Sequence, residues 1–213
     1  MYKKNIDNIL DYKNLPLSEN YNFPIITKQE IDLSKSIIPF NYAKSAKHYD
    51  KGVHFFIDDY QFERFWRAPK KYITMLAKFA FICTPDFSLY IDYPKAYQIA
   101  NHFKKQALGA LAQSFGLKVI PTLAWSDPTS FKWCFEGIEK GCVVAVSSVG
   151  CMNNKNSESL FVEGFKKAIE ILEPSKILFL GLVPEQLKGY TNLIVNKASF
   201  AEKFWREKYN VEE

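Results

Sequence analysis

Two continuous apolar runs in the C-terminal half of the chain predict neighbouring strands of a parallel sheet. Residues 142–146 and 176–181 both lack the alternation of polar and apolar positions that is typical of a half-exposed strand. Between them, the apolar residues of segment 158–173 recur at helical spacing and form one stripe. Ser157 is the expected N-cap of this helix, and Pro174 cannot continue it. The stretch therefore predicts a strand, a helix and a second strand parallel to the first.

The same alternation extends toward the N-terminus. Further strands are expected over residues 52–57, 78–83, 117–123 and 193–195. Further helices are expected after Asp58 and Asp59, from Pro69 to Leu76, over residues 95–115 and over residues 129–140. This order predicts an α/β domain with a largely parallel β-sheet flanked by helices. The alternative is an incomplete or distorted α/β barrel, in which short runs such as Leu89–Ile91 complete the circuit.

The first 51 residues differ in texture from the rest of the chain. They are rich in Asn, Tyr, Lys and Ser, and prolines are spaced through them. Short apolar runs at 23–26 and 37–40 would be unnecessary in a mobile tail. We therefore expect residues 1–51 to be an N-terminal extension, with only short pieces of regular structure, packed on a single α/β domain of residues 52–213.

Composition sets broad limits on function. The chain has 213 residues, of which 47% are hydrophobic and 16% aromatic, enough apolar material for a full core. The net charge of +5 permits contact with nucleic acid but does not argue for it, because a charge of this size is ordinary for solubility. No apolar run reaches the length of a membrane span, no signal peptide is visible, and the four cysteines show no C-x-x-C spacing. These features predict a reduced, cytoplasmic protein that has no membrane partner.

Chemistry is expected beyond the carboxyl ends of the strands, where sites lie in parallel α/β sheets. The polar and aromatic residues that follow the predicted strands are Asp58, Asp59, Thr84, Asp86, Trp125, Ser126, Asp127, Ser147, Ser148, Cys151 and Asn153. If they converge, they would form a polar pocket with an acid or base, or a metal site built from Asp oxygens. Each has a plainer interpretation, because an Asp before a helix is more often a cap and a Ser pair after a strand is more often turn chemistry.

Other motifs narrow the choice. There is no G-x-x-x-x-G-K-[ST] and no G-x-G-x-x-G after a strand, so neither a nucleoside triphosphatase nor a standard dinucleotide fold is expected. The histidines match no common metal-binding spacing, His102 is expected on a helix surface, and no metal or cofactor is assigned. Cys151 precedes a helix N-terminus, which would lower its pKa, but no histidine is identifiable as its base. An inert thiol is the preferred interpretation.

A basic and aromatic stretch covers residues 62–72. It mixes the cations Arg64, Arg67, Lys70 and Lys71 with aromatic side chains, a combination that can stack bases and hold phosphates. The preferred interpretation is an amphipathic helix whose aromatic rings pack inward while the cations are solvated.

Several blocks of the sequence resemble a known family. The blocks are Phe62–Trp66 with Pro69–Tyr72, Thr84–Ser88, Trp125–Asp127 and Val146–Gly150. Together they resemble the DUF4417 family of uncharacterised phage and mobile-element proteins, over about Asn41 to Tyr209. The resemblance implies a phage, plasmid or integrative-element origin and supplies no activity. Because the blocks coincide with the strand ends, it also points to Asp86, Trp125, Asp127, Ser147 and Ser148 as positions to test.

Two hypotheses of different classes follow. The first is an enzyme or small-ligand binder that acts on or binds a nucleotide or nucleic acid at the sheet edge. Its candidate catalytic residues are Asp86, Asp127, Ser147 and Ser148, and its candidate ligand-binding residues are Trp125, Asp58 and Asn153. The second is a non-catalytic accessory protein that engages DNA or a host protein through Arg64, Arg67, Lys70 and Lys71.

Overall fold

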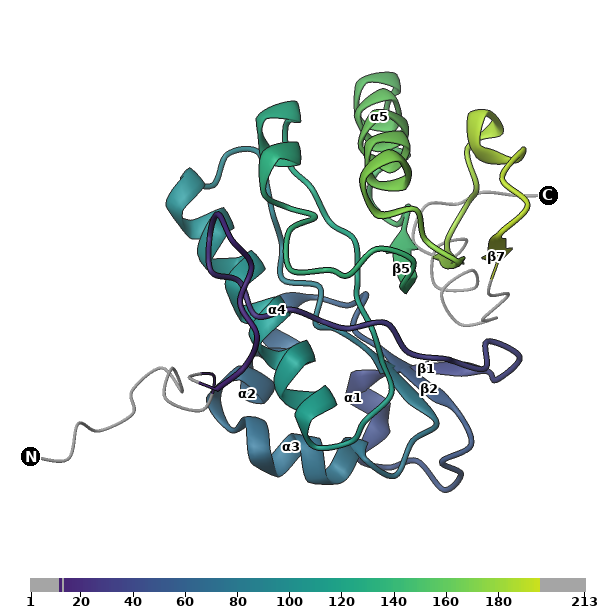
Figure 1. The fold of residues 1–213 in the computed structure, drawn as a ribbon. Helices are drawn as coiled ribbons and strands as arrows, with labels where there is room; N and C mark the ends of the chain where they lie inside the picture. Colours follow the sequence, from purple (N-terminus) through teal and green to yellow (C-terminus); the bar gives the residue numbers. More distant parts are fainter. Residues whose placement is uncertain (1–11, 13, 196–213) are drawn as a thin grey trace, which may run out of the picture.

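The computed structural model describes residue 12 and residues 14–195 of the chain (Figure 1). Its strands are β1 (Ile37–Pro39), β2 (Gly52–His54), β3 (Phe81–Cys83), β4 (Val119–Ile120), β5 (Val143–Ser147), β6 (Lys176–Leu180) and β7 (Leu193–Val195). Its α-helices are α1 (Phe40–Ala43), α2 (Asp59–Arg67), α3 (Pro69–Leu76), α4 (Lys95–Ser114) and α5 (Lys155–Leu172). Two short 3-10 helices, η2 (Pro128–Lys132) and η3 (Glu185–Leu187), complete the named elements.

The strands are all parallel and follow one another in chain order. One sheet has the order β1-β2-β3-β4 and the other has the order β5-β6-β7. A parallel bridge between Thr122 and Ala145 connects them, with Leu123 N–H donating to the Ala145 carbonyl at 2.7 Å. The predicted α/β architecture with parallel strands is therefore confirmed. Within the described residues the strands do not close into a barrel.

The two faces of the strands are covered differently. Val53 and Ile82 point toward α1 to α4 in one core cluster, and Val144 and Phe179 point toward α5 in a second. Figure 1 shows α1, α2 and α3 gathered beside β1 and β2, with α5 beside β5 at the other end of the molecule. The opposite faces of both sheets contribute to a third cluster that has no helical residue. Its strand members are Ile37, Phe81, Cys83, Ile120, Val143, Ala145, Leu178 and Leu180.

Several elements differ from the sequence-based prediction. The helix expected over residues 129–140 is wrong, because only η2 forms and turns follow it. Trp133, Cys134 and Phe135 are consecutive and all buried, and a regular helix cannot turn three consecutive side chains to one core. The expected N-cap of α5 is also wrong, because Asn154 occupies that position and its Oδ1 accepts the Ser157 N–H at 2.9 Å.

The strands of the N-terminal half are shorter than expected. The pairing of β2 ends at His54, and the run Leu89–Ile91 forms no strand but a loop at the carboxyl edge. A last short strand does form at β7, as predicted. None of the helices in the described range is long and apolar enough to cross a membrane.

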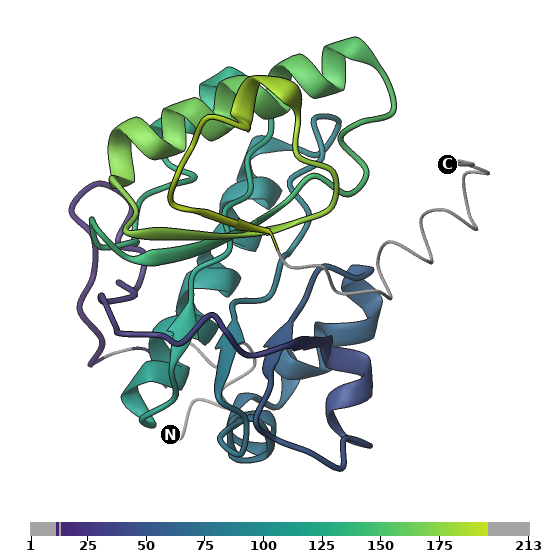
Figure 2. The ribbon, with the colours of Figure 1, turned by 90° about the vertical axis from the view of Figure 1, so that its right-hand side faces the viewer.

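The segment before β1 runs along the amino ends of the strands, as the purple chain in Figure 2 shows. Gln29 Oε1 accepts the N–H of Val119, the first residue of β4, at 2.8 Å. Lys28 N–H donates to Glu139 just before β5, and Ser36 accepts the N–H of Gly52 at 2.8 Å. Because this segment covers the amino edge, the carboxyl edge is the one left for a site. How the chain divides into domains stays a prediction.

Gly52 makes a testable close contact inside the first sheet. A Cβ placed there would lie 2.2 Å from the buried ring of Phe81 on the neighbouring strand. Gly52→Ala should lower the free energy of unfolding in urea by about 1–3 kcal/mol, because the ring must shift in a packed core. Gly189→Ala is the control, since a Cβ there meets nothing within 4 Å. Equal stability of the two variants would contradict this packing.

Candidate functional site

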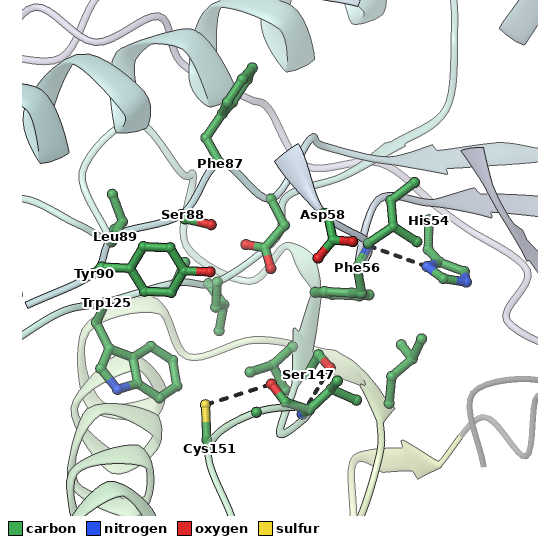
Figure 3. Close-up of a pocket in the computed structure, with 18 of the residues that line it drawn as sticks. His54, Phe56, Asp58, Phe87, Ser88, Leu89, Tyr90, Trp125, Ser147 and Cys151 are labelled. Atoms are coloured by element: carbon green, nitrogen blue, oxygen red, sulfur yellow. Dashed lines mark hydrogen bonds between the residues drawn. The ribbon is translucent and has the colours of Figure 1, made fainter. Parts of the chain in front are cut away.

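A pocket of about 830 Å³ opens at the carboxyl edge of the strands (Figure 3). Its walls come from the segments that follow β1, β2, β3, β4 and β5, and from the first turns of α5. In Figure 3, Tyr90 and Trp125 stand at one side and His54 at the other, with Asp58 and Ser147 between them. Five strand ends therefore converge on one cavity, because the strands are parallel and in chain order.

The pocket brings together four of the seven candidate catalytic and ligand-binding residues. Asp58, Asp86, Trp125 and Ser147 all line it. Their roles as catalytic or ligand-binding residues stay predictions. Ser147 is held in place because its Oγ accepts the N–H of Val149 at 3.2 Å.

Three other candidates do not line the pocket, and each forms a hydrogen bond elsewhere in the protein. Asp127 caps η2, where its Oδ1 accepts the Thr129 N–H at 2.8 Å, and the Thr129 side chain lowers the pKa of this carboxyl. Ser148 is buried and its Oγ donates to the Leu182 carbonyl at 2.7 Å. Asn153 donates from Nδ2 to the Gly150 carbonyl within a turn. The hydrogen bonds of Asp127 and Asn153 are the cap and turn chemistry weighed against a functional role, whereas Ser148 bonds to the segment that follows β6.

Asp86 is the most unusual group in the pocket. It is partly buried, and its Oδ1 has no hydrogen-bond partner. Burial raises the pKa of Asp86 to about 7, while attraction from Lys105 lowers it and repulsion from Asp59 adds to the rise. Near neutral pH this carboxyl can therefore accept or donate a proton.

His54 is a pocket residue that the sequence analysis did not select. Burial lowers the pKa of His54 to about 4, so the ring is neutral at pH 7. Its Nδ1 accepts the Phe56 N–H at 3.3 Å, which leaves the proton of the neutral ring on Nε2. The signal was available in the alternation of β2, where His54 shares a face with Gly52 and not with Val53, which packs against the helices.

Trp125 is fixed by the helix beside it. Its Nε1 donates to the Leu160 carbonyl at 3.2 Å, and its ring centroid lies 5.3 Å from that of Phe161. Gly164 makes room for the indole, because a Cβ there would come within 2.3 Å of it. With its only donor already used, Trp125 offers a ligand its aromatic surface.

The loop after β3 is tied down from two directions. Asp59 accepts the Ser88 hydroxyl at 2.9 Å and the Ser88 N–H at 3.1 Å. Asn101 on α4 donates to the Ser88 carbonyl at 2.9 Å. This loop also carries Tyr90, whose exposed ring borders the pocket.

The charged side chains among the described lining residues are all carboxyl groups. Asp58, Asp86 and Asp92 line the pocket, while no Lys or Arg does within the described part of the chain. In the same part of the chain, no cluster of three or more His, Cys, Asp or Glu side chains is arranged to hold a metal ion. The pocket therefore offers hydrogen-bond acceptors and negative charge rather than a cradle for phosphate.

Cys151 and His102 differ from what the sequence predicted. Burial raises the pKa of Cys151 to about 11, with Asp86 adding to the rise, so the expected lowering by a helix N-terminus is wrong. This protonated thiol fits the inert interpretation. His102 is not on a surface but fully buried beneath the turns that follow η2. Its Nε2 donates to the Glu136 carbonyl at 2.9 Å.

The basic and aromatic stretch forms α2 and α3. Its rings Phe62, Phe65 and Trp66 are buried. The cations Arg64, Arg67, Lys70 and Lys71 are all exposed. The charged ends of Arg64 and Lys71 lie 6.0 and 5.8 Å from the ring centre of Tyr72. The preferred interpretation, with rings inward and cations in solvent, is confirmed.

Comparison with known proteins gives a family and two relatives. A family model described as "Domain of unknown function (DUF4417)" matches residues 15–196. The chain is 40% identical to the Gene 1 protein of Mycobacterium phage L5 over 129 residues, which are 61% of this chain and 56% of that protein. It is 37% identical to the Gene 1 protein of Mycobacterium phage D29 over 129 residues, 61% of this chain and 48% of that protein. The chain thus spans about half the length of these relatives, and no solved structure matches it.

His54 predicts a pH dependence of stability. The pKa of His54 is near 4 when folded and near 6.5 when unfolded, so between these values the unfolded chain binds more protons. Acidification from pH 6.5 to 4 should therefore destabilise the protein through His54, by roughly 3 kcal/mol at most. His54→Asn keeps an acceptor for the Phe56 N–H and removes the titration.

Urea unfolding of both proteins at several pH values measures this effect. The free energy of unfolding of His54→Asn should improve relative to wild type as the pH falls. A difference that does not change with pH would show that His54 is not buried as a neutral ring.

Proposed function

The chain belongs to the DUF4417 family, and we propose that its pocket binds a nucleobase, of a free nucleotide or of a nucleic acid. The observation that carries this proposal is a cavity with aromatic and carboxylate walls and, among the described residues, no lining Lys or Arg. A base has an aromatic face and N–H donors at its edge, and both find partners in such a cavity.

The aromatic walls support the proposal. Phe56, Tyr90 and Trp125 present rings from three different segments of the chain. Because Trp125 already uses its N–H, its contact with a ligand would be through the ring face. A volume of about 830 Å³ lies within the range of small-molecule sites.

The polar groups support an edge-on contact with a base. Asp58 and Asp86 supply acceptors, and the Nε2–H of His54 supplies a donor on the other side. With no Lys or Arg among the described lining residues, phosphate groups gain nothing inside the pocket and would stay at its mouth. The four free thiols agree with the reduced, cytoplasmic setting that the proposal assumes.

A second candidate function is binding of DNA by α2 and α3. The observation in its favour is the exposure of Arg64, Arg67, Lys70 and Lys71 along one short stretch, with Arg64 and Lys71 close to Tyr72. Arg67 also approaches a carboxylate, with its Nε 3.9 Å from Glu63 Oε1, but its side chain stays 77% exposed. Exposed cations interleaved with a ring suit a phosphate backbone.

Calorimetric titration tests the first function. The four common ribonucleosides and their 5′-monophosphates are each titrated into the protein. At least one nucleoside should bind, and its monophosphate should bind no more tightly. Asp86→Asn should weaken that nucleoside by about tenfold or more, since a charged hydrogen-bond acceptor is lost.

Asp32→Asn is the matched control, because Asp32 lies in the segment at the opposite edge and pairs with the Ser34 N–H. Its affinity for the nucleoside should equal that of wild type. Binding of the monophosphates alone, or of no nucleoside at all, would sink the proposal.

Fluorescence anisotropy with single- and double-stranded DNA tests the second function. If four phosphates are contacted, affinity should fall roughly a hundredfold between 50 and 200 mM salt. Arg64→Gln with Lys71→Gln should weaken binding and reduce the salt dependence. Lys166→Gln with Lys167→Gln on α5 is the control pair. Absence of binding at low salt, or equal loss in both double variants, would remove this function.

A further inference from the structure

Helix α4 turns a polar face into the interior. Gln98, Asn101, His102, Lys105 and Gln106 are all buried on it. Most of these buried side chains form hydrogen bonds. Gln98 donates to the Tyr90 and Tyr93 carbonyls, and Asn101 donates to the Ser88 carbonyl, so both hold the pocket loop. Lys105 has no such hydrogen bond.

Lys105 is a cation in an unusual place. Its side chain is only 1% exposed, and among the described residues its Nζ has no hydrogen-bond partner. A buried ammonium that lacks a counter-charge is strongly destabilising, so an anion that attracts it matters. Asp86 is such an anion, because its attraction opposes the lowering of the Lys105 pKa by burial.

Asp86, on the pocket side, also lacks a hydrogen-bond partner. Its Oδ1 is buried and bonds to none of the described residues. Lys105 does not line the pocket, whereas Asp86 does. Among the described residues, Asp86 therefore lies in the pocket wall and Lys105 lies buried behind the lining, and electrostatic attraction links the two groups.

We propose that Lys105 is a positioning residue that shifts Asp86 toward its carboxylate form, so that near neutral pH the pocket can present a negative charge to its ligand. A carboxylate only accepts hydrogen bonds, whereas the protonated acid also donates one. The charged form thus selects a ligand edge made of N–H donors, such as amino groups and ring N–H groups. This last step rests on the proposed binding of a base, while the charge state of Asp86 does not.

The other titratable groups around the pair do not replace Lys105. Asp59 on α2 repels Asp86, and Cys83 on β3 and Cys151 before α5 have raised pKa values and stay protonated. Around Lys105, burial raises the pKa of Cys134 to about 12, and burial lowers the pKa of His102, which is neutral. Lys105 is therefore the only cation that stabilises the Asp86 carboxylate from among these groups.

A ligand-free titration tests the proposal. The side-chain carboxyl carbons of aspartate are followed by NMR against pH in carbon-13-labelled protein, and Asp86→Asn identifies the Asp86 signal. In Lys105→Met the pKa of Asp86 should rise by about one unit or more, because the stabilising cation is lost. Lys104→Met is the matched control on the same helix, because its Nζ pairs with Asn101 and not with Asp86. Its Asp86 titration should match wild type.

The reciprocal titration keeps the proposal testable if Lys105→Met does not fold. In Asp86→Asn, the pKa of Lys105, followed through its Cε signal, should fall, because the coupling between two sites is mutual. An unchanged Asp86 titration in folded Lys105→Met, or an unchanged Lys105 titration in Asp86→Asn, would overturn the proposal. Neither experiment contains a nucleoside, so failure here is distinct from failure of the proposed function.

Discussion

Two buried threonines lie where the first sheet meets the second. Thr122 donates its N–H to the Thr84 hydroxyl and its own hydroxyl to the Thr84 carbonyl, both at 2.8 Å. On its other side, Thr122 forms the bridge to Ala145 in the second sheet. Both threonines are fully buried, so these bonds are shielded from water. The pocket depends on this joint, because its walls come from segments on both sides of it.

Helix α4 lies behind the loop after β3 and supports this wall of the pocket. Hydrogen bonds from α4 and from Asp59 hold the loop after β3 in place. Polar side chains buried on a helix are stabilising only when they are paired, and here their partners are the carbonyls of that loop. The pocket is thus largely formed before any ligand arrives, which reduces the entropy cost of binding.

Charge is separated between the pocket and the outer helices. The carboxylates lie in the cavity, and burial raises the pKa of one of them, Asp86. The exposed cations of α2 and α3 lie on the helical side of the first sheet, where solvent screens them. The two proposed functions therefore use different surfaces. They differ also in what salt does to them, because only contacts with several phosphates release many counterions.

The sequence by itself determined the direction of the strands and the edge where a site forms. The continuous apolar runs and the helical stripe between them specify parallel pairing, because the period of the pattern is a local property of the chain. For the same reason Asp58, Asp86, Trp125 and Ser147 were predicted at strand ends, and the structure places all four in one pocket.

Which of the residues after strands line the pocket became clear only in the folded structure. Asp127, Ser148 and Asn153 follow strands equally well, yet nearby backbone groups occupy their hydrogen-bonding atoms. His102 was expected on a helix surface, yet it and Lys105 are buried, and His102 bonds to the carbonyl of Glu136, which is distant in sequence. Burial and long-range pairing depend on contacts between segments that are distant in sequence. No local pattern records those contacts, and they set the charge of Asp86.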